Sequence, residues 1–98
     1  MGSKVIFAPR AIADPEEITR HIAKDDPEAA ARVGYRLIER VRVLESFPLL
    51  GSPYKKRPGV RKLLSNPYLI FYRPDPKAGR VEILRYWHGA QLEPPIVE

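Results

Sequence analysis

The sequence predicts an α+β fold in which two N-terminal helices form a hairpin that packs on a mainly antiparallel four-stranded sheet. Helix-start chemistry occurs twice in the first half of the chain, and three short strand-like runs separated by turn residues fill the second half. Strands joined by short turns pair antiparallel, and the apolar stripe of the longer helix needs a sheet face to bury itself. With 98 residues, the chain is expected to form a single domain over residues 1–98.

The first elements are a short strand at residues 4–8 and a helix that runs to about Lys24. Asp14 is suited to cap this helix, because Pro15 fits the first helical position. Ile12 precedes this cap, so a start one turn earlier with a bend at Pro15 is the alternative.

The second helix repeats this start chemistry, with Asp26 as the cap and Pro27 at the first position. It is expected to end before Pro48, which gives roughly 20 residues. Apolar or small residues recur at spacings of four and three and define the face that packs on the sheet. They are Ala30, Gly34, Leu37, Val41 and Leu44.

A breaker-rich connection at residues 48–59 leads to three predicted strands. The last strand alternates from Val81, but its face assignment is open at Leu84 and Arg85. Two prolines near the C-terminus predict a loose tail. The three strands are expected at residues 60–65, 68–73 and 80–87.

The composition excludes several function classes. The chain has no cysteine, which excludes disulfides, thiolate nucleophiles and cysteine-based metal sites. Two histidines are too few to suggest a zinc site, and no cofactor-binding motif is present. No apolar run approaches the roughly 20 residues of a membrane span, so a cytoplasmic protein is expected.

The net charge of +5 is concentrated in one central segment. Residues 1–45 carry 8 basic and 8 acidic side chains, and residues 75–98 carry 3 basic and 4 acidic ones. Residues 46–74 carry 6 basic side chains and no acidic one. Such a patch is typical of a protein that binds an anionic partner; a solvated loop is the alternative. The basic residues of the segment are Lys55, Lys56, Arg57, Arg61, Lys62 and Arg73.

Five fragments of the sequence resemble, in order and spacing, those of toxins in the RelE/ParE superfamily, and in particular its ParE-like branch of plasmid stabilisation proteins. Together they cover about residues 5 to 91. They are Asp-Pro-Glu-Ala-Ala at 26–30, Phe-Pro-Leu-Leu-Gly at 47–51, Gly-Val-Arg-Lys-Leu at 59–63, Tyr-Leu-Ile-Phe-Tyr-Arg at 68–73 and Val-Glu-Ile-Leu-Arg-Tyr-Trp-His-Gly-Ala at 81–90.

The resemblance implies a toxin of a type II toxin–antitoxin system that is neutralised by a small antitoxin encoded beside it. ParE-like members poison DNA gyrase, whereas RelE-like members cut mRNA on the ribosome. RelE-like nucleases tend to carry an arginine after the aromatic that corresponds to Tyr68, and another after the last strand. This chain has Leu69 and Gln91 there. The resemblance of the fragments to the ParE-like branch, rather than this chemistry, favours gyrase inhibition without an enzymatic step. Cleavage of mRNA is the alternative, and a non-toxic binding module for an anionic partner is a second one.

The expected target-binding surface consists of the basic residues of the central segment and Arg85. A ribonuclease must activate a 2′-hydroxyl, stabilise charge at the phosphate and protonate the leaving oxygen. If the chain is one, the candidates are Arg61, Arg73, Arg85 and His88, with His88 as the general acid. The alternative role of His88 is to end the strand and bind a nearby loop.

Several remaining side chains are expected to pack rather than react, namely His21, Tyr86 and Trp87. The apolar residues beyond the main stripe exceed what one sheet face can bury. They are expected to meet the antitoxin, and they are Ile12, Val33, Tyr35 and Val43.

Overall fold

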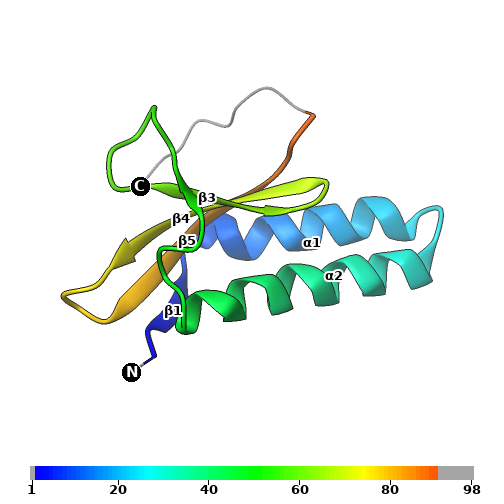
Figure 1. Cartoon of the computed structure of the whole chain (residues 1–98). Coiled ribbons are helices and arrows are strands. Elements are labelled where there is room, and N and C mark those ends of the chain that lie inside the picture. The colour runs from blue at the N-terminus through cyan, green and yellow to red at the C-terminus, as the bar shows by residue number, and fades with distance from the viewer. Residues whose placement is uncertain (1, 91–98) are drawn as a thin grey trace.

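Two helices lie side by side against one face of a five-stranded sheet in the computed structural model, which describes residues 2–90 (Figure 1). The helices are α1 (Pro9–Ala23) and α2 (Pro27–Arg42), and a short 3-10 turn, η1 (Val43–Glu45), follows α2. The strands are β1 (Lys4–Phe7), β2 (Ser52–Pro53), β3 (Arg61–Ser65), β4 (Tyr68–Asp75) and β5 (Arg80–His88). The predicted α+β class is confirmed. The expected tail at residues 93–95 lies outside the described residues.

The sheet order is β1-β5-β4-β3-β2. The predicted antiparallel pairing of the three long strands is confirmed, while β1 pairs parallel to β5 at one edge. The predicted number of four strands is wrong. Within the connection that the sequence predicts to be irregular, Ser52 and Pro53 pair with β3 as a two-residue edge strand, and an edge is where a strand tolerates proline.

The first helix begins at Pro9 rather than at Asp14, so the predicted cap is wrong and the earlier start is confirmed. Pro9 occupies the first helical position and Pro15 lies inside the helix. The extra turn is stabilised by burial, since Ala11 is fully enclosed in the core. The second helix begins as predicted, because the Asp26 carboxylate accepts a hydrogen bond from the Ala29 N–H at 3.1 Å.

The main core lies between the helices and the inner face of the sheet. It combines the α2 stripe with inward side chains of β3, β4 and β5, including Leu37, Val41, Leu63, Ile70 and Ile83. A smaller cluster lies on the outer face, where Tyr54 and Val60 from the β2–β3 connection cover Phe71 and Leu84. Both faces of the sheet are therefore partly buried. Neither helix within residues 2–90 is long and apolar enough to cross a membrane.

A β-bulge in β5 explains why its faces could not be assigned from sequence. Phe71 pairs with Arg85 while Tyr72 pairs with Ile83, so Leu84 is an extra residue on β5. The bulge interrupts the alternation and puts Leu84 in the outer cluster. Because of this extra residue, Tyr86, two positions after Leu84, points into the main core.

Candidate functional site

The predicted basic residues occupy different parts of the sheet. Lys55, Lys56 and Arg57 lie on the connection between β2 and β3, and both lysines are exposed. Lys62 pairs with Phe71 of the outer cluster, so alternation puts Lys62 on the outer face. The structure therefore brings only part of the predicted set onto one surface.

Arg61 lies on the opposite face of β3 and has a structural contact. It pairs with the core residue Tyr72, and its guanidinium donates to the carbonyl oxygens of Gly51 at 2.7 Å and Leu49 at 3.3 Å. The side chain thus holds the backbone that leads into β2. The Arg61 guanidinium therefore stabilises the fold, and only part of it is left to bind a partner.

Arg73 lies on β4 opposite Glu82 of β5. Their ion pair is long, at 3.8 Å, and the two side chains are 29% and 39% exposed. Solvent screens such a pair, so its contribution to stability is small. Arg73 keeps a position on the outer face beside Lys62, where an anionic partner could reach it.

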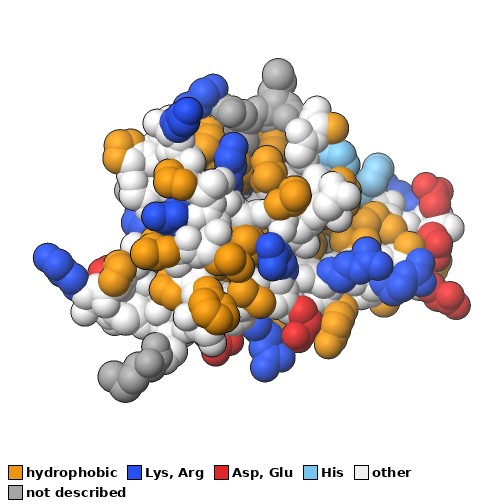
Figure 2. Space-filling view, in the orientation of Figure 1, with side chains coloured by type: hydrophobic (Ala, Val, Ile, Leu, Met, Phe, Trp, Pro, Cys, Tyr) orange, Lys and Arg blue, Asp and Glu red, His pale blue; other side chains and the backbone are white. Residues whose placement is uncertain are grey.

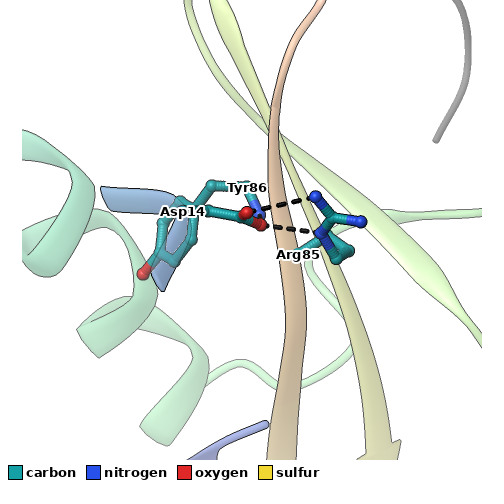
Figure 3. Close-up of polar contacts among 3 residues, drawn as sticks. All are labelled: Asp14, Arg85 and Tyr86. Atoms are coloured by element: carbon teal, nitrogen blue, oxygen red, sulfur yellow. Dashed lines mark hydrogen bonds and ion pairs between the residues drawn. The ribbon is translucent and has the colours of Figure 1, made fainter. Parts of the chain in front are cut away.

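Arg85 is buried, in contrast to its predicted role in surface binding. It is 5% exposed, and its guanidinium forms two hydrogen bonds to the Asp14 carboxylate, at 2.8 and 3.1 Å (Figure 3). The same carboxylate accepts the backbone N–H of Tyr86 at 3.0 Å. Because β1 pairs with β5 only as far as Ile83, Asp14 takes the place of a strand partner beyond that point. The Arg85–Asp14 pair therefore fixes α1 to β5.

A groove of about 500 Å³ opens beside this pair, between α1 and the end of β5. Both histidines of the chain line it, His21 from α1 and His88 from β5. His88 accepts the N–H of Ala90 through Nδ1 at 3.0 Å, and its ring meets the edge of Tyr68 with 5.4 Å between centroids. This geometry agrees with His88 ending a strand and binding the adjacent turn. His21 is exposed rather than packed.

The tyrosines near the groove are poor proton donors to a reaction near neutral pH. Burial raises the pKa of Tyr68 above its ordinary value. Burial, and secondarily the nearby Asp14 charge, raises the pKa of Tyr86. Within residues 2–90 there is also no cluster of His, Cys, Asp and Glu that could hold a metal ion. Besides these tyrosines, the groove is lined by the acid–base side chains Glu17, His21 and His88 and by Asp14, which is bound to Arg85.

Two features of this region were missed from the sequence. The Asp14–Arg85 pair joins residues 71 positions apart, and both residues had other plausible roles. The contact of Gly51 with the hydroxyl of Tyr72 was also missed. A glycine after an apolar run and a tyrosine in a core strand were the only signals, and neither specifies the other.

Comparison with known proteins identifies the chain as a small toxin of the RelE/ParE superfamily. The family model described as "ParE toxin of type II toxin-antitoxin system, parDE" matches residues 5–93. The chain belongs to this family, the toxins of type II toxin–antitoxin systems.

Relatives and solved structures agree with this assignment. The protein named "Putative toxin Y4kP" of Sinorhizobium fredii is 37% identical over 89 residues, which are 90% of each chain. A chain of the chromosomal ParDE system from P. aeruginosa superposes with a TM-score of 0.76 at 26% identity, covering 88% of this chain and 95% of that one. A chain of the RelBE2 toxin–antitoxin complex from Mycobacterium tuberculosis gives a TM-score of 0.64 at 27% identity, with 90% and 99% covered.

Proposed function

We propose that this toxin inhibits DNA gyrase by binding to it, without a catalytic step of its own, and that a cognate antitoxin neutralises it. The observation that carries the proposal is the burial of Arg85. The sequence offers this cation of the last strand as a phosphate ligand, but it is 5% exposed and bound to Asp14. Two of its three guanidinium nitrogens are already bound to the Asp14 carboxylate, which neutralises the charge that a scissile phosphate would need.

The exposed Lys55 and Lys56 and the half-buried Lys62 and Arg73 support binding rather than catalysis. Lys55, Lys56 and Lys62 together with Arg73 provide positive charge over the β2–β3 connection and the outer sheet face. Such a patch attracts an acidic surface and speeds encounter with it. Gyrase is a protein that acts on DNA, and the phosphate backbone of DNA is negatively charged.

An antitoxin partner is supported by the matched structures, which come from a ParDE system and a RelBE2 toxin–antitoxin complex. The helical hairpin and the η1 turn that follows it leave large apolar side chains exposed, as predicted for Ile12 at 57%, Tyr35 at 66% and Val43 at 36%. Val33 instead packs against the main core. We propose that the antitoxin covers these exposed residues, and that both proteins act in the cytoplasm.

Pulse labelling in bacteria after induced expression tests the proposed target. Thymidine and methionine incorporation are followed separately from the moment of induction. An early fall in thymidine incorporation, with filamentous cells, supports gyrase inhibition. An early fall in methionine incorporation supports mRNA cleavage instead. Normal growth with neither change would support the non-toxic binding module.

Cleavage of mRNA is retained as a second candidate because of the groove beside His88. His88 and His21 line it together with Arg10, so a general acid and a cation share one cavity. If this candidate is correct, the His88→Ala variant loses toxicity while keeping its fold. Under gyrase inhibition by binding, the same variant stays toxic.

A further inference from the structure

Three large apolar side chains are exposed in the connection between η1 and β2. Phe47 is 63% exposed, Leu49 is 55% exposed and Leu50 is 49% exposed. They occur within four consecutive residues, so their exposed surfaces are close together. We call this segment, residues 47–50, the apolar loop. A concentrated apolar surface of this kind is typical of a contact site.

The backbone of the apolar loop is held in place by hydrogen bonds. The Leu50 N–H donates to the Phe47 carbonyl oxygen at 3.1 Å, which closes a turn with Pro48 at its second position. The Arg61 guanidinium binds the carbonyl oxygen of Leu49 at 3.3 Å. The loop is therefore a fixed structure even though its side chains face solvent.

The end of the loop is anchored in the core at Gly51. Its N–H donates to the buried Tyr72 hydroxyl at 2.8 Å, and its carbonyl oxygen accepts from Arg61 at 2.7 Å. A Cβ atom at this position would lie 2.6 Å from the Lys62 carbonyl oxygen and 2.8 Å from the Tyr72 ring. Only glycine fits this approach. Because the loop is already ordered, it loses little conformational entropy when a partner binds.

The chain after the apolar loop is basic, whereas the exposed Glu45 lies just before it. No acidic residue occurs anywhere in residues 46–74, while Lys55 and Lys56 are exposed in the same segment. Figure 2 shows hydrophobic side chains with Lys and Arg side chains among them on the pictured face, and Asp and Glu side chains toward its lower and right edges. A surface that complements the loop would therefore offer an apolar pocket with carboxylates at its rim.

We propose that the apolar loop is the anchor by which the toxin docks on its target, and that it inserts into an apolar pocket with an acidic rim on that protein. The inference rests on the proposed function and adds the place and chemistry of the contact. Nucleic acid is a weaker fit, because the phosphate backbone is bound by cations and exposed bases by aromatic or planar groups. Of the three exposed side chains of the loop, only Phe47 is aromatic. A second copy of this chain fits worse, because it would bring two basic segments together.

The test compares a loop variant, Leu49→Ser, with a matched control, Ile38→Ser. The control removes an aliphatic side chain that is 57% exposed, close to the 55% of Leu49, but on the helical hairpin. Growth arrest after induction in cells that lack the antitoxin is measured beside binding to purified gyrase. The loop variant is expected to bind about tenfold more weakly or worse, as is common for central apolar anchors. Thermal melts of both variants must match the wild type.

The outcomes separate this inference from the proposed function. If the wild type does not arrest growth, both are overturned. If the wild type arrests growth and binds gyrase but the loop variant does so equally well, the inference alone is overturned. If the wild type arrests growth without binding gyrase, gyrase is not the target and the proposed function is wrong. In that case, loss of growth arrest in the loop variant but not in the control still supports the loop as the docking anchor. If Lys55→Ala with Lys56→Ala abolishes arrest while the loop variant keeps it, charge alone makes the contact and the inference is wrong.

Discussion

Replacing Asp14 by alanine tests whether its pair with Arg85 holds the helical layer on the sheet. Both side chains are 6% exposed, so the variant leaves a buried guanidinium without its counter-ion. Removing one partner of a buried pair costs about 3–5 kcal/mol. The variant also leaves the Tyr86 N–H without its hydrogen-bond acceptor. A buried donor without a partner costs about 1–3 kcal/mol. The two losses involve the same carboxylate, so they do not simply add.

This loss is large compared with a total stability of about 5–15 kcal/mol for a chain of this size. At about 4–8 °C per kcal/mol, the Tm should fall by at least about 12 °C. Urea unfolding followed by circular dichroism measures the free energy. Trp87, the only tryptophan, reports locally, because its ring centroid lies 5.0 Å from the Arg85 guanidinium carbon.

The matched control is Arg80→Ala, which removes the exposed ion pair of Arg80 with Asp75 at 4.0 Å. That change should cost about 0–1 kcal/mol. Removing both partners together, as Asp14→Ala with Arg85→Met, should cost less than the sum of the two single changes. A loss in Asp14→Ala no larger than in the Arg80 control would refute the argument that this pair fixes α1 to β5.

Further predictions concern the loop anchor, the alkaline limit and the helix cap. Gly51→Ala should destabilise the protein by about 1–3 kcal/mol, because the added methyl meets backbone and the Tyr72 ring; a melt unchanged from wild type would contradict this. Burial raises the pKa of Tyr86. The stability that the buried, protonated Tyr86 contributes is therefore complete below the ordinary tyrosine pKa of about 10, and it is lost as the pH rises further. Tyr86→Phe should therefore lose less stability than the wild type between pH 8 and pH 11 in urea titrations. Asp26→Ala should cost about 1 kcal/mol in the same titration at pH 7, since the Ala29 N–H loses its cap; no loss would show that solvent replaces it.

The fold was predictable where local chemistry decides it. Asp26 and Pro27 specify the start of α2, and short turns specify the antiparallel order of β3, β4 and β5. Local chemistry failed at Asp14. Aspartate is a common helix cap, but burial of Ala11 extends the helix beyond Asp14. The Asp14 carboxylate instead accepts a hydrogen bond from Arg85.

The candidate site was less predictable because it depends on long-range contacts. Charge counting located the basic segment, but it could not tell that Arg61 binds loop carbonyls or that Arg85 is buried. The bulge at Leu84 decides the direction of Arg85, and no residue there marks it. The sequence marks residues 47–50 only as part of one family-like fragment, because it does not report that their apolar side chains are exposed.

Supercoiling of relaxed plasmid by purified gyrase, with the toxin added and no ribosome present, tests the central claim most directly. The account predicts loss of supercoiling at toxin concentrations comparable to gyrase, and restoration when the cognate antitoxin is added. Unchanged supercoiling at a large excess of a toxin that still arrests growth would contradict gyrase inhibition and direct attention to His88 and mRNA.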